Sequence, residues 1–159
     1  MNYICVFLII IVIMYIIGLI IINDKHTSND SISFEETFNK SGLPIITLNN
    51  RDYPLNFLID TGSDVCCINK DSLKFIHYTQ TNKKAHFVTA TGPVESQSVV
   101  ISLNDKENDV NIEFNVLDFS AQFKEVEEKN GVHIDGILGS RFCGDAGLII
   151  DFSKLIVTI

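Results

Sequence analysis

The residues with the clearest potential for chemistry are Asp60, Thr61 and Gly62, which follow the apolar run Phe57-Leu58-Ile59. This order places a carboxyl group at the edge of a core. Gly62 permits a tight turn that brings backbone N–H groups near the carboxyl group, and Thr61 can form a hydrogen bond behind it. A carboxyl group held in this way is suited to acid–base chemistry. The same residues also fit an ordinary turn that leaves a strand, so the motif alone does not distinguish a catalytic site from a structural turn.

Two further segments favour the catalytic interpretation. Downstream lies Asp135-Gly136-Ile137-Leu138-Gly139, in which two apolar residues and a glycine precede a predicted short helix. Between the two motifs, residues 86–94 have the pattern of a strand, a glycine turn and a second strand. In order and spacing, the three segments resemble the D-T-G motif, the second signature and the flap of the retropepsin family of aspartic proteases. The resemblance covers residues 43–159 and is closest to single-domain, membrane-anchored members.

The resemblance implies a role for each part of the site. Asp60 would hold the attacking water together with a second carboxyl group, one acting as general base and the other as acid. Thr61 would link two active-site turns, and Gly62 would leave room for the substrate backbone. The flap would close over an extended peptide that pairs as an added β-strand. The implied substrate-binding residues are Ser63, Asp64, Thr89, Ala90, Thr91, Gly92, Pro93, Ile137, Leu138 and Gly139, and no cofactor or metal is implied.

The second carboxyl group is predicted to come from a second copy of the chain. Aspartic proteases use two carboxyl groups that share one proton, because two like charges about 3 Å apart cannot both ionise. The chain has one D-T-G, and neither Asp135 nor Asp151 is followed by Thr-Gly or Ser-Gly. It is also too short for the two-lobed version. We therefore expect a symmetric homodimer with Asp60 of each subunit on the two-fold axis, and the family resemblance makes residues 155–159 an interface strand.

Two features near the site leave alternatives open. Asp64 is either the ion-pair partner of Arg141 or a solvated carboxylate. Pro93, directly after Gly92, removes an N–H donor from the flap and can alter its contacts with substrate.

The cysteines and histidines show no metal-site spacing. Cys66 and Cys67 are neighbours on a predicted strand and point to opposite faces, so they cannot both line one metal site without distortion. Cys143 completes no zinc motif with them. We expect buried or free thiols, and no Cys/His hydrolase pattern accompanies them.

Short β-strands separated by turn residues must position these groups. Asn49-Asn50-Arg51-Asp52 is typical of a hairpin turn, and the following strand alternates apolar residues with a period of two. The expected fold class is all-β: a small closed or partly closed antiparallel β-barrel of the retropepsin type with one or two short helices, preceded by one transmembrane helix. The predicted strands span residues 43–48, 53–59, 94–103 and 110–116, with a terminal hairpin over 147–159 and helical turns over 72–76 and 122–129.

Residues 1–22 predict a membrane anchor. They contain no Asp, Glu, Lys or Arg, and a helix over residues 3–22 matches the roughly 30 Å hydrocarbon core of a bilayer. The basic start and the small-residue cleavage site of a secretory signal are absent, which favours an uncleaved single-pass helix. Polar residues 23–40 predict a tether, in which 34–40 form either a helical turn or an edge segment, and 41–159 form the protease domain. The flanking charges do not decide which side of the membrane this domain faces.

Composition limits the remaining function classes. The chain has 159 residues and a formal net charge of −8, and all 20 acidic and 12 basic residues lie outside residues 1–22. An acidic surface without Lys/Arg clusters repels phosphate backbones, which argues against nucleic-acid binding. The predicted partners are an extended peptide or protein substrate, a second subunit and the lipid bilayer. Two other interpretations stay open: a catalytically silent retropepsin-like module that binds peptides or dimerises, and a structural β-domain with accidental motifs.

Overall fold

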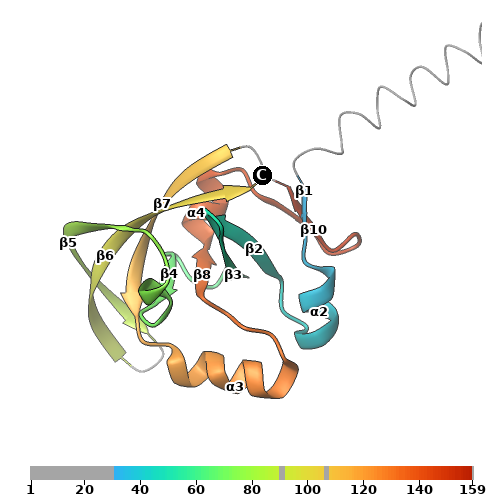
Figure 1. Ribbon diagram of the computed structural model, residues 1–159, viewed down its shortest axis with the longest axis horizontal. Coiled ribbons are helices and arrows are strands. Elements are labelled where there is room, and N and C mark those ends of the chain that lie inside the picture. The colour runs from blue at the N-terminus through green and yellow to red at the C-terminus, as the bar shows by residue number, and fades with distance from the viewer. Residues whose placement is uncertain (1–30, 90–91, 106–107, 159) are drawn as a thin grey trace, which may run out of the picture. The chain divides into compact units, whose positions relative to one another are not determined.

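The structure is a computed structural model that describes residues 31–89, 92–105 and 108–158 (Figure 1). The chain divides into two compact units, Met1–Ser31 and Ile32–Ile159. The predicted anchor, residues 1–22, lies outside the described residues. In the part of the chain that is described, no helix is long and apolar enough to cross a membrane.

A seven-stranded sheet dominates the second unit. Its strands are β2 (Ile45–Asn50), β3 (Tyr53–Asp60), β4 (Cys67–Asn69), β5 (Thr79–Thr89), β6 (Gly92–Asp105), β7 (Asn108–Leu117) and β8 (Gly136–Gly139). Their order is β2-β3-β8-β4-β7-β6-β5, and an additional pairing between β2 and β6 partly closes the sheet (Figure 1). Neighbouring strands are antiparallel except for the parallel pairs β3–β8 and β4–β7. The predicted all-β, mostly antiparallel and partly closed fold is confirmed.

The two predicted strand pairs form with tighter turns than expected. In the β2–β3 hairpin, Asn50 pairs with Tyr53, so only Arg51 and Asp52 make the connection. In the β6–β7 pair, the ladder continues to the pairing of Asp105 with Asn108. The polar residues that we assigned to turns therefore extend the strands, because backbone pairing does not require apolar side chains.

A second, three-stranded sheet has the order β1-β10-β9 and consists of β1 (Ser31–Ser33), β9 (Ile149–Asp151) and β10 (Ile156–Thr158). The predicted terminal hairpin is confirmed, because β9 and β10 pair antiparallel with Val157 opposite Ile150. β10 lies in the middle of this sheet, and Val157 is fully buried. Both edges of β10 are thus paired within the chain.

The helical turns predicted over residues 72–76 and 122–129 and the short helix predicted after Gly139 are confirmed. With a further helix that begins at Glu35, the described residues hold more than the one or two short helices of the expected fold class. The C-terminal end of the longest helix follows ordinary capping rules: Gly131 has a φ of +68°, and its N–H donates to the Glu127 carbonyl at 2.8 Å. The helices are α2 (Glu35–Ser41), the 3-10 helix η1 (Ser72–Lys74), α3 (Ser120–Asn130) and α4 (Ser140–Asp145).

The folded domain includes residues before position 41, where the sequence predicted its start. Phe34 is buried, its N–H donates to the Leu155 carbonyl at 2.9 Å, and its ring makes edge contacts with Phe38 and Phe152 at centroid distances of 5.9 and 5.6 Å. β1 and α2 therefore belong to the fold. The helical alternative for residues 34–40 is confirmed, and the tether predicted over residues 23–40 extends too far. The spacing of Phe34 and Phe38 by four residues places both rings on one helical face.

The core explains why the strands align. Leu55, Phe57 and Ile59 are buried, as their alternation predicted, and Phe57 packs on Phe114 with ring centroids 5.4 Å apart. Each such side chain contributes about 2 to 3 kcal/mol on burial. Tyr53, expected on the same face, is 39% exposed because it lies at the tip of the hairpin. A smaller cluster that holds α3 consists of Ile45, Phe123, Val132 and Ile134.

Asp135, a rival for the second catalytic acid, is a buried structural residue. Its side chain accepts hydrogen bonds from Asn56 N–H at 2.9 Å and from the Ser72 hydroxyl at 2.8 Å, and its Oδ1 lies 3.3 Å from His133 Nε2. Only 4% of Asp135 is exposed. These contacts tie β3 and η1 to the start of β8, so the acid is used for structure.

His133 predicts that stability depends on pH. Partial burial opposes the charged imidazole, but the hydrogen bond to Glu127 and the nearby carboxylates of Asp135 and Glu127 outweigh burial and raise the pKa of His133. A folded-state pKa above the unfolded one stabilises the protein fully below the unfolded pKa, near 6.5, and this contribution is lost as pH rises through the folded pKa. The free energy of unfolding lost in His133→Gln should therefore be larger at acidic than at alkaline pH, as measured by urea denaturation.

Glu127→Gln provides the second arm of this experiment. It removes the partner of His133 Nδ1, which lies 3.1 Å away, and should weaken the same pH dependence. Equal losses of stability for His133→Gln at both pH values would contradict the prediction.

Candidate active site

The D-T-G turn directly follows β3. Asp60 is the last residue of that strand and is half-buried, whereas Thr61 and Gly62 are exposed. The Gly62 N–H donates to Asp60 Oδ1 at 2.9 Å, and the Ser63 N–H donates to the Asp60 carbonyl at 3.2 Å. A Cβ added at Gly62 would lie 3.1 Å from Asp60 Oδ1. The turn therefore orients the carboxyl group through a backbone N–H, the arrangement that the motif predicted.

β8 brings the second motif against this turn. It lies between β3 and β4, with Asp60 paired to Gly139 and Cys67 paired to Ile137. Leu138 is fully buried, and Ile137 is half-buried. A Cβ added at Gly139 would lie 2.4 Å from the Val65 carbonyl oxygen, so only glycine permits this close approach. The chain from Asp60 to Cys67 thus wraps around the end of β8.

Two polar residues that the sequence did not indicate hold the exit from the D-T-G turn. The Ser140 N–H and hydroxyl both donate to the Ser63 carbonyl, at 2.7 and 2.9 Å. The Asn115 backbone N–H and side-chain Nδ2 both donate to the Cys66 carbonyl, at 2.9 and 3.3 Å. Apolar and polar residues alternate from Val110 to Val116, a pattern that predicts a solvent-facing Asn115. Asn115 is only 7% exposed, however, because the exit from the turn packs over it.

The predicted flap is the β5–β6 hairpin. Thr89 pairs with Gly92 and Val88 pairs with Pro93, so the hairpin closes where the glycine turn predicted it. Gly92 has a φ of +123°, a value that other residues rarely adopt. Ala90 and Thr91 lie outside the described residues.

A pocket of about 580 Å³ lies beside the D-T-G turn. It is bounded by Asp64 and Cys66 after the turn, by Lys84 of β5, and by Arg141 and Asp145 of α4. Asp64 and Arg141 share this pocket without forming an ion pair in the described structure, and Asp64 is exposed. The solvated alternative for Asp64 therefore holds in the single chain.

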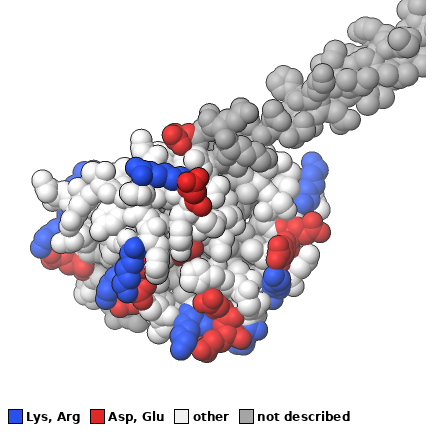
Figure 2. All heavy atoms as spheres, in the orientation of Figure 1, with Lys and Arg blue, Asp and Glu red and all other residues white. Residues whose placement is uncertain are grey.

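Lysines on the same pocket are paired with glutamates across the sheet. Lys83 contacts Glu113 at 2.8 Å, and Lys84 contacts Glu95. These pairs are exposed, so each contributes little to stability. Figure 2 shows acidic and basic side chains interspersed on the visible face.

The three described cysteines are protonated, buried thiols. Burial raises the pKa of Cys66 to about 11 and the pKa of Cys67 to about 12, and it also raises the pKa of Cys143. None of them forms a disulfide within the described chain. Because the thiolate is the reactive form, these residues are poor nucleophiles and poor metal ligands at neutral pH. No group of three or more metal-ligating side chains occurs among the described residues.

One comparison with known proteins identifies a family for this chain. Residues 45–142 match the family model described as aspartyl protease. Among curated proteins there is no match. Similar solved structures include EIAV protease complexed with the inhibitor HBY-793, with 22% identity, a TM-score of 0.47, and coverage of 66% of this chain and 88% of that chain. The retroviral protease-like domain of Ddi1 from Leishmania major has 12% identity, a TM-score of 0.46, and coverage of 73% and 90%. A retropepsin-like aspartic protease from Rickettsia conorii has 18% identity, a TM-score of 0.47, and coverage of 80% and 87%.

Proposed function

Because this chain belongs to the aspartyl protease family, we propose that it is a retropepsin-like endopeptidase that hydrolyses peptide bonds with water held between two Asp60 carboxyl groups. The observation that carries the proposal is the D-T-G turn, which presents Asp60 at the end of β3 and is packed around Gly139 of β8. A motif produced by chance would not require the second motif as its packing partner.

The proposed reaction needs one charged and one protonated carboxyl group. The charged Asp60 takes a proton from water as the water oxygen bonds to the peptide carbonyl carbon. The protonated Asp60 of the other subunit donates its proton to the carbonyl oxygen, which gives a tetrahedral diol. The first carboxyl group then protonates the nitrogen as the C–N bond breaks, and a diol proton returns to the second carboxylate. Both groups end as they began, so no cofactor is consumed.

The stoichiometry of the site supports a homodimer. Asp135 is committed to the hydrogen bonds with Asn56 and Ser72, and Asp151 accepts bonds from the Ser153 N–H and hydroxyl. Neither is available as the partner of Asp60, so the second carboxyl group comes from another copy. Because β10 is flanked by β1 and β9, a partner strand must add at the outer edge of one of these strands or displace β1.

The proposed location is a membrane surface. Residues 1–22 lack charged side chains and have the length of a single span, so they would anchor the domain to the bilayer. Residues 89–93 of the flap would close over an extended peptide, with Ser63, Asp64 and Ile137 beside it. Leu138 and Gly139, which the sequence assigned to substrate binding, are buried in the packing of β8, so they would support the site without contacting the peptide.

Proteolysis of an unfolded protein library tests the function. We expect the full-length chain to cleave library members, and we expect pepstatin, an inhibitor of aspartic proteases, to block the cleavage. Binding of library peptides without any cleavage would instead support the catalytically silent module. Cleavage that pepstatin does not affect would contradict the proposed chemistry.

Activity should depend on protein concentration. If two chains build one site, dilution below the dimer dissociation constant should lower the rate per subunit in proportion, about tenfold for each tenfold dilution. At high concentration the rate per subunit should reach a plateau. Initial rates over a dilution series, together with sedimentation at the same concentrations, measure both quantities. A sedimenting monomer with full activity would contradict the shared site.

A further inference from the structure

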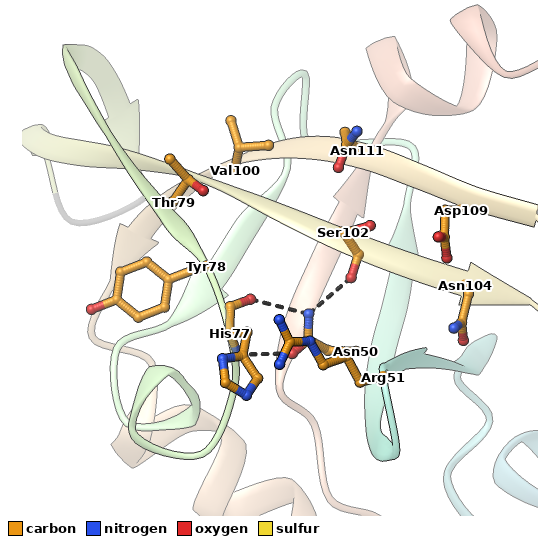
Figure 3. Close-up of a pocket in the computed structure, with 10 residues that line it drawn as sticks. All are labelled: Asn50, Arg51, His77, Tyr78, Thr79, Val100, Ser102, Asn104, Asp109 and Asn111. Carbon is orange, nitrogen blue, oxygen red and sulfur yellow. Dashed lines mark hydrogen bonds between the residues drawn. The ribbon is translucent and has the colours of Figure 1, made fainter.

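A second pocket, of about 470 Å³, lies far from Asp60. Its walls are the tip of the β2–β3 hairpin, the segment before β5, and the outer face of β6 and β7 (Figure 3). The hairpin tip and Asp60 are at opposite ends of β3, which is eight residues long; at about 3.3 Å per residue they are roughly 25 Å apart. The proposed peptidase mechanism uses none of the residues in this pocket.

One buried amide builds the floor of the pocket. Asn50 is 3% exposed, its Nδ2 donates to the carbonyls of His77 and Ser102 at 3.0 and 2.8 Å, and its Oδ1 accepts from the His77 N–H at 2.8 Å (Figure 3). These bonds join the hairpin, the entry to β5 and the middle of β6. The pocket is therefore held in shape before any ligand arrives.

Both arginines of this chain, Arg51 and Arg141, line pockets. Neither forms an ion pair or a side-chain hydrogen bond within the described structure, although acidic residues outnumber basic ones. Arginine binds carboxylate and phosphate groups in a bidentate manner that lysine cannot reproduce. Ion pairs do form at seven lysines: Lys40, Lys70, Lys74, Lys83, Lys84, Lys124 and Lys154.

The backbone at Arg51 is unusual as well. Its φ is +56°, in a two-residue hairpin connection where glycine, asparagine and aspartate are favoured. Glycine would fit this turn with less strain, so the backbone does not require arginine. The arginine side chain is what distinguishes this pocket from a plain hairpin tip.

The groups around Arg51 define a ligand. Besides the guanidinium group of Arg51, the pocket is lined by the hydrogen-bonding side chains of His77, Ser102 and Asn104. The Asp109 carboxylate lies on the opposite side of the pocket from His77 (Figure 3). We propose that this pocket binds an oxyanion, the carboxylate or phosphate group of a small polar ligand, at Arg51. The charge of Asp109 confines the anionic group to the arginine end, and that carboxylate accepts hydrogen bonds from the remainder of the ligand.

Titration of the full-length chain with inorganic phosphate, and separately with glutarate, tests the proposal and distinguishes phosphate from carboxylate. Chloride at the same ionic strength is the reference, and the backbone amide shifts of His77, Tyr78 and Ser102 are the readout. We expect saturable shifts with at least one of the two anions. Arg51→Gly should weaken this binding about tenfold or more, because it removes the charge-assisted bonds. The variant should keep its hairpin, because glycine adopts the observed φ freely.

Two matched variants control for charge. Lys129→Gln makes the same change in net charge on α3, outside the pocket, and should leave binding unchanged. Asp109→Asn removes the opposing carboxylate from the pocket and should not weaken binding of inorganic phosphate. Shifts that persist unaltered in Arg51→Gly, or that chloride reproduces, would mean an adventitious ion only and would overturn the proposal. The absence of saturable shifts with both anions would overturn it too.

Discussion

Asp60→Asn is expected to lower kcat/KM by about a thousandfold or more, since positioned acid–base groups contribute factors of this order. In a homodimer, one substitution replaces both carboxyl groups. The amide cannot take a proton from water or hold the shared proton. Its Oδ1 can still accept the Gly62 N–H bond that Asp60 Oδ1 accepts at 2.9 Å. The turn should therefore survive, and the loss should be chemical.

The measurement needs three readouts on the same preparation: cleavage of a peptide selected from the library, the denaturation midpoint, and sedimentation. The last two should match the wild type. Asp52→Asn is the matched control, because it makes the same chemical change on an exposed residue at the other end of β3 and should leave turnover unchanged. Turnover close to that of the wild type in Asp60→Asn would remove this residue from the mechanism.

The sequence predicted those parts of the fold and site that depend on local pattern. Leu55, Phe57 and Ile59 alternate, so their strand and its buried face were predictable. Gly62 and Gly92 mark the turn and the flap that the sequence predicted, because a side chain at either position is strained. The close approach of Gly139 to Val65 was not predicted and follows from the structure.

The remaining features depend on contacts between distant segments. Asn115 follows the outward phase of β7 but is covered by the exit from the D-T-G turn, about fifty positions earlier in the chain. In the sequence, Ser140 is an ordinary first residue of a helix, and only the structure shows that its hydroxyl donates to the Ser63 carbonyl. Asp135 has the form of a motif acid, yet its partners Asn56 and Ser72 come from other elements. No periodicity within one segment predicts such pairings.

Long-range contacts also explain why the folded domain includes residues 34–40. Residues 23–40 are polar on average, and average composition indicated a tether. Phe34 is buried only because the Leu155 carbonyl and the Phe152 ring, from the other end of the domain, meet it. Composition gives the residue types of a segment, whereas the burial of a residue depends also on the residues of other segments that pack against it.

Gly139→Ala is expected to produce the largest loss of stability, because the added Cβ would clash with the backbone of Val65. The added Cβ would lie 2.4 Å from the Val65 carbonyl oxygen, 2.6 Å from its carbonyl carbon and 2.8 Å from its nitrogen. No rotamer change can relieve these contacts, so β8 and the D-T-G turn must move apart. Overpacking of this kind costs about 1 to 3 kcal/mol or more.

The same displacement should impair the site, since Gly139 is the β-pairing partner of Asp60. A misplacement of about 1 Å at a catalytic group lowers turnover by about a hundredfold. Gly144→Ala is the matched control: its added Cβ meets nothing within 4 Å, and alanine favours the α4 helix by about 1 kcal/mol. Urea denaturation and kcat per folded subunit should therefore separate the two alanine variants, with Gly144→Ala at or above wild-type stability. If Gly139→Ala matched Gly144→Ala in both quantities, the packing of β8 would not position Asp60, and the catalytic interpretation of the Ile137-Leu138-Gly139 motif would lose its physical basis.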